Sequence, residues 1–245
     1  MSQRGRVRVE QGPKRVRIML GGVWVADTKR PLLVWEKPYY PTYYIPVSDI
    51  ADGVLEPNGS TTSSPSRGPA TVYDVRSGGA VAEGAAYRHL DSPIEEIRDA
   101  VAFEWAAMDH WFEESEEVFV HPRDPYKRVD ILASDRSVRI EIDGTTLAET
   151  SSPTLLFETS LPRRLYIPKT DVRMDLLEPS DHATECPYKG VARYWSFGGH
   201  DNVVWSYPFP TLESVKIAGL MCFYDERVDV HVDGELQAHP KTPFS

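Results

Sequence analysis

Apolar and polar residues alternate in two short runs on either side of a glycine pair near the start of the chain. The runs cover residues 16–20 and 23–26, and Gly21-Gly22 separates them. Two such runs joined by two turn residues are typical of a β-hairpin. A similar arrangement surrounds Asp143-Gly144. The sequence therefore predicts a hairpin in each half of the chain.

The chain contains the same domain twice. When residues 16–70 are compared with the segment about 122 positions further on, about 20 of roughly 55 pairs are identical without any gap. Tyr44-Ile45-Pro46, for example, aligns with Tyr166-Ile167-Pro168. We therefore expect two copies, residues 1–124 and 125–245, each long enough to bury its own core. The short junction at 121–125 contains two prolines, which predicts that the copies pack against each other as an internal pseudo-dimer.

Further segments in both copies predict strands. They are residues 32–36, 71–75 and 118–120 in the first copy and 154–158, 192–197 and 228–232 in the second. Hairpin turns are predicted at Gly78-Gly79, Gly198-Gly199 and Asp233-Gly234. The proline-rich segment 37–46 predicts an edge strand that ends at Tyr44-Ile45.

Other segments depart from the strand pattern. Prolines, glycines and serines accumulate at 56–70 and 178–192, which predicts long irregular loops, and such loops are usually functional. Ser92-Pro93-Ile94-Glu95 has the cap residue, proline and glutamate typical of a helix start, and 211–218 is a weaker counterpart. Residues 106–117 predict an amphipathic helical turn. The expected fold is mainly β, with one short helix in each copy.

Charge and composition narrow the classes of function. The chain has 41% hydrophobic and 26% charged residues, as folded proteins do, and its net charge of -10 disfavours nucleic acid and anionic membranes as partners. No apolar run is long enough for a membrane span or signal peptide, so we expect a cytoplasmic protein. Cys186 and Cys222 have no neighbours at metal-ligand spacing. We therefore expect no disulfide framework, no metal site and no cofactor.

Short motifs in the second half of the chain resemble a bacterial family. They include Cys186-Pro187-Tyr188-Lys189-Gly190, Ala192-Arg193-Tyr194-Trp195 and Trp205-Ser206-Tyr207-Pro208. With their neighbours over residues 130–235 they resemble the domain-of-unknown-function family four-two-seven, which also carries a nucleotidyltransferase-like label. The first copy resembles it more loosely, in a tandem form seen mostly in actinobacteria. The resemblance implies a small β domain similar to the tent-like sheets of the Mss4 group, although the CxxC zinc ligands common there are missing, and it brings no established activity.

Reactive side chains are concentrated in the second copy. At Asp175, His182, Cys186 and three further positions it has chemically active residues where the first copy has glycine or serine. We expect one site per chain, with Cys186 as a nucleophile, Lys189 favouring its thiolate and His182 as its base. Asp175 or Glu178 would orient them. A buried structural thiol is the alternative for Cys186, and a hydrogen bond to loop amides is the alternative for Glu178.

Other residues of the second copy could bind a ligand. The fork of Arg193 suits a carboxylate or phosphate, and Lys189 could contact the same anion. Trp195, Trp205 and Tyr207 could form a stacking wall for a flat ligand such as a nucleobase, or they could be core residues.

The hypothesis that follows is a protein that binds a small anionic or nucleotide-like ligand in a loop pocket of the second copy. Two alternatives stay open. One is an enzyme that acts on such a substrate through Cys186, His182 and Lys189. The other is a structural or interaction protein built as an internal pseudo-dimer.

Overall fold

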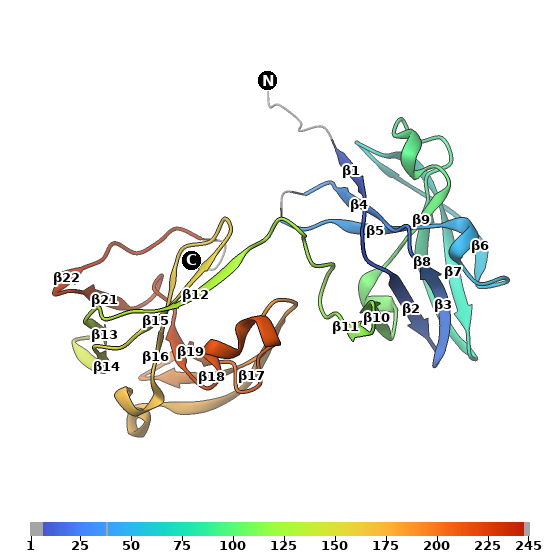
Figure 1. Ribbon diagram of the computed structural model, residues 1–245. Coiled ribbons are helices and arrows are strands. Elements are labelled where there is room, and N and C mark those ends of the chain that lie inside the picture. Colours follow the sequence, from blue (N-terminus) through green and yellow to red (C-terminus); the bar gives the residue numbers. More distant parts are fainter. Residues whose placement is uncertain (1–6, 38, 243–245) are drawn as a thin grey trace. The chain divides into compact units, whose positions relative to one another are not determined.

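The computed structural model describes residues 7–37 and 39–242, and β-strands are its main regular elements. The chain divides into two compact units, Met1–Asp124 and Pro125–Ser245, each with two antiparallel sheets (Figure 1). The predicted fold class, mainly β in two tandem copies, is confirmed.

The first unit has a seven-stranded and a four-stranded sheet. The large sheet has the order β1 (Arg8–Gln11), β4 (Leu32–Trp35), β5 (Thr42–Pro46), β9 (Ala100–Phe103), β8 (Ala80–Arg88), β7 (Gly68–Ser77) and β6 (Leu55–Ser64). The small sheet has the order β11 (Glu116–Glu117), β10 (His110–Glu113), β2 (Val16–Leu20) and β3 (Val23–Thr28).

The second unit repeats this arrangement strand for strand. Its large sheet has the order β12 (Val129–Ala133), β15 (Thr154–Glu158), β16 (Arg164–Ile167), β20 (Met221–Phe223), β19 (His200–Ser206), β18 (Gly190–Phe197) and β17 (Glu178–Cys186). Its small sheet has the order β14 (Thr145–Thr150), β13 (Val138–Ile142), β21 (Asp229–Val232) and β22 (Glu235–Leu236). The internal repeat of the sequence is thus a repeat of topology.

The predicted hairpins are present, and the predicted loops are wrong. Turns at Gly21-Gly22, Asp143-Gly144, Gly78-Gly79, Gly198-Gly199 and Asp233-Gly234 each join two paired strands. Residues 56–70 and 178–192, however, form the hairpins β6–β7 and β17–β18. Since β6 and β17 are edge strands exposed along most of their length, they need no apolar alternation and tolerate proline.

Strand β5 is central and not at the edge, contrary to the prediction. It lies between β4 and β9, and Tyr44 and Ile45 are fully buried on opposite faces. The prolines do not interrupt the ladder because Pro41 precedes the strand and Pro46 is its last residue. The predicted strand at 118–120 is absent, and its place in the small sheet is taken by β10 and β11.

The described residues contain 3-10 turns and no α-helix. The turns are η1 (Val47–Asp49), η2 (Glu95–Ile97), η3 (Trp105–Ala107), η4 (Lys169–Asp171), η5 (Met174–Leu176) and η6 (Leu212–Ile217). The predicted helix at Ser92 reduces to η2 because the chain enters β9 at Ala100. The predicted helical turn at 106–117 is mainly strand, since His110–Glu113 pairs with β2. None of these turns is long and apolar enough to cross a bilayer.

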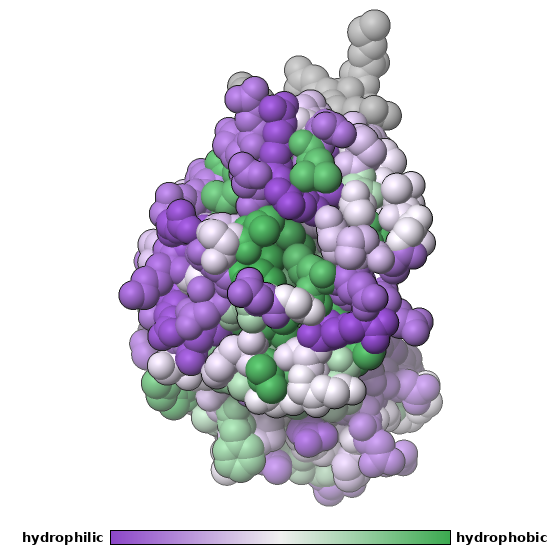
Figure 2. All heavy atoms as spheres, turned by 90° about the vertical axis from the view of Figure 1, so that its right-hand side faces the viewer, coloured by the Kyte–Doolittle hydropathy of each residue, from purple (hydrophilic) through white to green (hydrophobic). Residues whose placement is uncertain are grey.

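Each unit has two groups of buried side chains, one on each face of its large sheet. In the second unit, Ile140, Ile167 and Val204 belong to the group between the two sheets. Tyr166, Trp205 and Cys222 belong to the group on the opposite face, which is called the outer face below. On the side drawn in Figure 2, hydrophilic side chains cover much of the surface, and a group of hydrophobic side chains lies near the middle.

Candidate functional site

The outer face of the second unit carries a buried cluster of aromatic side chains. Successive residues of a strand point to opposite faces, so β16, β18, β19 and β20 each turn alternate residues to this face. Among these residues are Tyr166, Tyr194, Trp205 and Cys222, with Tyr207 just after β19. Burial raises the pKa of Tyr166 and of Tyr207 well above the ordinary value. Both phenols are therefore neutral at physiological pH.

A buried ion pair lies at the edge of this cluster. The Lys189 Nζ is 2.5 Å from the Glu158 Oε2, and the two side chains are 12% and 10% exposed. Burial lowers the pKa of Lys189, but its interactions with Cys186 and with the Glu158 carboxylate outweigh it, so the pKa is raised. Lys189 lies one turn from Cys186, whose carbonyl oxygen accepts a hydrogen bond from the Lys189 backbone N–H at 3.3 Å, and Glu158 joins them as the partner of the ammonium group.

The turn that carries Lys189 is fixed by backbone contacts. The Tyr188 carbonyl accepts hydrogen bonds from the hydroxyls of Thr211 (2.6 Å) and Ser214 (2.9 Å), which lie at η6. Gly190 has a φ of +95°, and a Cβ there would lie 3.1 Å from the Phe209 carbonyl oxygen. A side chain at this position would strain the turn, which explains the glycine.

His182, Asp175 and Glu178 are not part of this group. His182 and Cys186 are four residues apart on an extended strand, which separates them by about 13 Å. The His182 ring instead packs at 4.7 Å from Tyr194, and Asp175 pairs with Arg173 at 2.7 Å. Glu178 is exposed at the other end of β17, about 26 Å from Cys186. Residues near in the sequence are held apart because the segment is a strand and not a loop.

The proposed aromatic wall is divided between the two faces of the sheet. Trp205 and Tyr207 lie in the outer cluster, where the Trp205 Nε1 donates to the Tyr166 hydroxyl at 3.3 Å. Trp195 packs against the group between the sheets, so it lies on the other face. Arg193 shares that face by strand alternation. Arg193 and Trp195 therefore cannot hold a ligand together with Lys189 and Trp205.

The first unit has the same ion pair with a different cation. The Arg67 Nη2 is 2.7 Å from the Glu36 Oε2, and the hydroxyls of Ser64 and Ser66 donate to the Glu36 Oε1 at 2.8 and 2.6 Å. Burial raises the pKa of Glu36, but these donors and the charge of Arg67 outweigh it and lower the pKa. The acid of the pair is glutamate in both copies.

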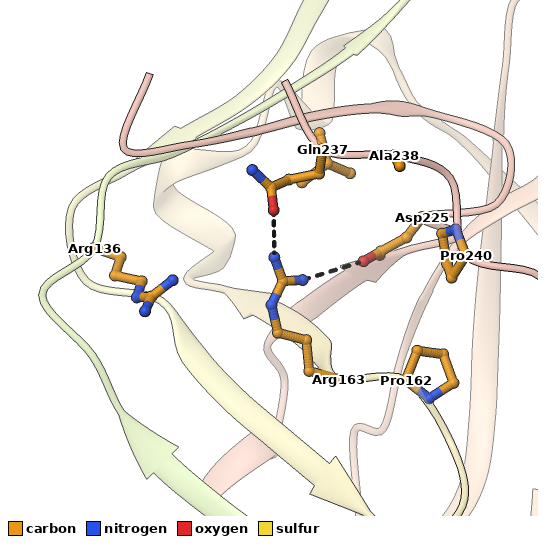
Figure 3. A pocket seen from close by; sticks show the side chains of 8 residues that line it. Arg136, Pro162, Arg163, Asp225, Gln237, Ala238 and Pro240 are labelled. Carbon is orange, nitrogen blue, oxygen red and sulfur yellow. Dashed lines mark hydrogen bonds and ion pairs between the residues drawn. The ribbon is translucent and has the colours of Figure 1, made fainter. Parts of the chain in front are cut away.

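A cavity of about 370 Å³ lies elsewhere in the second unit (Figure 3). Arg163, just before β16, points into it, donates to the Gln237 amide oxygen at 3.2 Å and lies 4.0 Å from Asp225. Arg136, from the β12–β13 connection, lines the same cavity. Burial raises the pKa of Asp225 to about 6 although Arg164 and Arg163 lower it.

The first unit has a cavity of about 430 Å³ at the corresponding place. Strand pairing aligns Tyr40 with Pro162, Trp105 with Asp225 and Trp111 with Val230, and all six residues line one or the other cavity. Four segments contribute to both cavities: the β4–β5 connection, the residues after β9, strand β10 and the residues after β11, with their counterparts in the second unit. Other segments line only one of the two, such as the β12–β13 connection with Arg136. The fold therefore repeats the cavity, while the lining differs.

Comparisons with known proteins identify the domain. The family model described as a domain of unknown function (DUF427) matches residues 8–114 and 130–234. The chain belongs to this family. A search of curated proteins found no match. The two matched segments fall one in each unit, so each unit contains one DUF427 domain.

Sequence reasoning missed the lining of the cavities in both DUF427 domains. The acids of the two ion pairs, Glu36 and Glu158, could have been found from the sequence, because they align across the copies. Arg136 and Arg163 belong to no motif and meet only through folding. Among residues 7–37 and 39–242, no group of three or more histidine, cysteine, aspartate or glutamate side chains is arranged to hold a metal ion.

Proposed function

We propose that the second DUF427 domain binds a small molecule carrying an oxyanion, either a carboxylate or a phosphate, in the cavity of Figure 3. The observation that supports this is the pair of guanidinium groups in its lining, Arg136 and Arg163. Each has five N–H donors. The one hydrogen bond that either guanidinium makes within the described residues is from Arg163 to Gln237. The ion pairs of Arg136 with Asp233 (3.9 Å) and of Arg163 with Asp225 (4.0 Å) are long, so both guanidinium groups keep N–H donors for an anion.

The charge of the cavity also favours an anion. Its lining has two arginines and one carboxylate, Asp225, while Asp233, outside the lining, lies 3.9 Å from Arg136. Because the pKa of Asp225 is about 6, mild acid neutralises it and makes the cavity more positive. Binding of an anion with constant charge should therefore strengthen as the pH falls from 7.5 to 5.5.

This location differs from the one expected from the sequence. Lys189 is a poor anion contact because Glu158 already neutralises it in a buried pair. Arg193 lies on the other face of the sheet, so it cannot assist Lys189. A small anionic ligand in the second copy thus remains the proposal, with Arg136 and Arg163 as its contacts.

Isothermal titration calorimetry with sodium sulfate tests this proposal, since sulfate keeps its charge over the pH range used. We expect binding that Arg163→Ala weakens at least tenfold and that strengthens at pH 5.5. Asp225→Asn should remove the pH dependence. The matched control is Arg128→Ala, which removes an exposed arginine of the same unit that does not line the cavity. Sodium chloride at equal ionic strength controls for screening.

Two results would overturn the proposal. One is sulfate binding no tighter than that of chloride. The other is sulfate binding that Arg163→Ala leaves unchanged in a protein whose circular dichroism matches the unmodified chain.

A second candidate function is chemistry at Cys186, and the position of Lys189 beside it, across one tight turn, favours it. An ammonium group next to a sulfur supports a reactive thiolate. The test compares the alkylation rate of Cys186 by iodoacetamide in the unmodified chain and in Glu158→Gln/Lys189→Met, which removes the ion pair without leaving a buried charge. A rate that falls at least tenfold supports activation by Lys189. An unchanged rate means that exposure alone controls Cys186, and the enzyme hypothesis then fails.

A further inference from the structure

Aromatic rings form a large part of the lining of the cavity in the first unit. Tyr40, Tyr87, Phe103, Trp105, Trp111 and His121 all contribute to its wall. A volume of about 430 Å³ lies within the usual range for small-molecule pockets, which are commonly apolar with a few polar groups. The first copy has glycine or serine where the second has reactive residues, so its sequence motifs do not indicate a site at this cavity.

Two stacked pairs of rings give the wall flat surfaces. Trp105 and Trp111 have ring centroids 4.4 Å apart and an interplanar angle of 5°. Tyr40 and His121 stack at 3.9 Å and 10°. Trp111 is nearly fully buried, and its Nε1 donates to the Trp105 carbonyl oxygen at 3.1 Å. These contacts fix the ring planes before any ligand arrives, which reduces the ordering cost of binding.

The charged residues of the lining balance one another. Two acids, Glu36 and Glu104, face two bases, Lys37 and Arg67. Glu36 is already neutralised by Arg67 at 2.7 Å. There is no excess negative charge to select an organic cation, as in an aromatic cage. There is also no excess positive charge to select an anion, as in the second unit.

We propose that the first unit binds a flat, uncharged heteroaromatic ring of the nucleobase class in this cavity. Such a ring stacks on aromatic side chains, and its polar edge can use the charged groups of Lys37, Arg67 and Glu104 as donors and acceptors. This site is separate from the oxyanion site proposed above, which lies in the other unit.

The second unit lacks an aromatic cavity of this kind, and two charged residues at the corresponding positions explain the difference. Thr42 lines the first cavity and corresponds to Arg164 of the second unit. The Arg164 guanidinium lies 5.5 Å from the Trp205 ring and pairs with Glu226 at 2.7 Å. Glu226 corresponds to Ala106, another lining residue of the first cavity. A long ion pair in the second unit thus replaces two small side chains in the first. Thr42→Arg and Ala106→Glu should therefore fill the cavity of the first unit with the ion pair of the second.

The test is isothermal titration calorimetry of the full chain with adenosine and uridine. We expect binding that Tyr40→Ala weakens about tenfold, the loss typical of one stacking contact. Tyr39→Ala is the matched control, because Tyr39 is an exposed neighbour outside the lining. The transplant Thr42→Arg/Ala106→Glu should abolish binding. The circular dichroism of all three variants should match that of the unmodified chain, which reports that the first unit is folded. Sulfate binding by the second unit should also stay unchanged, which keeps the two proposals separable.

Three outcomes would overturn the inference. The first is no binding of either nucleoside at millimolar concentration. The second is nucleoside binding that neither Tyr40→Ala nor the transplant changes. The third is tighter binding of choline than of the nucleosides, which would make the cavity a cation site.

Discussion

Replacing Lys189 by methionine should strongly destabilise the second unit. Lys189 and Glu158 are 12% and 10% exposed and 2.5 Å apart, so Lys189→Met leaves a carboxylate without its cation in a buried place. Removing one partner of a buried ion pair costs about 3–5 kcal/mol in free energy of unfolding. That is a large share of the total stability of a domain of this size. At about 4 °C per kcal/mol, the unfolding temperature of the unit should fall by about 12–20 °C.

The structure offers a matched control in the same unit. Arg173 and Asp175 form an ion pair with a similar distance, 2.7 Å, but the side chains are 57% and 62% exposed. Water already solvates both groups, so Arg173→Met should cost less than about 1 kcal/mol. The ratio of the two losses isolates burial as the cause.

The first unit supplies an intermediate case. Glu36 and Arg67 are 25% and 20% exposed, and the Ser64 and Ser66 hydroxyls also donate to Glu36. Arg67→Met should therefore cost less than Lys189→Met, because two donors remain on the carboxylate.

Urea unfolding followed by far-ultraviolet circular dichroism measures all three losses. The double variant Glu158→Gln/Lys189→Met should recover most of the stability lost in Lys189→Met, since it leaves no unpaired charge. The reasoning is refuted if Lys189→Met costs no more than Arg173→Met. It is also refuted if the double variant is as unstable as the single one.

Two further predictions concern a turn and a carboxyl group. Gly78 and Gly198 occupy corresponding turns with φ of +57° and +55°, but a Cβ on Gly78 would lie 2.0 Å from the Gly21 carbonyl oxygen, whereas a Cβ on Gly198 meets nothing within 4 Å. Gly198→Ala should cost about 1 kcal/mol and Gly78→Ala at least about 2 kcal/mol more, as measured by urea unfolding; equal losses would contradict the clash. Asp225 has its pKa raised from 3.8 to about 6, so the folded state holds the proton more tightly than the unfolded state. The free energy of unfolding should fall as the pH rises from about 4 to 6, by about 3 kcal/mol at most, and stay level above that range. Thermal unfolding across this pH range measures the fall, and Asp225→Asn should be flatter than the unmodified chain; an identical slope would show that other groups cause it.

The sequence could predict the local parts of the fold. A tight turn needs glycine or aspartate at a fixed place between alternating strands, so Gly21-Gly22 and Asp143-Gly144 indicate hairpins without any tertiary information. The internal repeat likewise indicates two equal domains. The edge strands β6 and β17 were harder to predict from the sequence, because they are exposed on both faces and have no alternation of apolar and polar residues. Their prolines, glycines and serines resemble those of loops.

The sequence also indicated that Cys186 and Lys189 lie near each other, because three residues across a tight turn cannot separate them far. It could not place His182, since a strand carries it about 13 Å away, nor separate Trp195 from Trp205, since adjacent strands present them to opposite faces. Only the tertiary structure decided the cavities. Their walls come from several segments far apart in the chain, and sequence order does not show which segments meet. The two copies share the backbone that shapes each cavity, because the paired strands fix its course. The side chains of the lining are not needed for this pairing, and they are arginines in one copy and aromatic rings in the other.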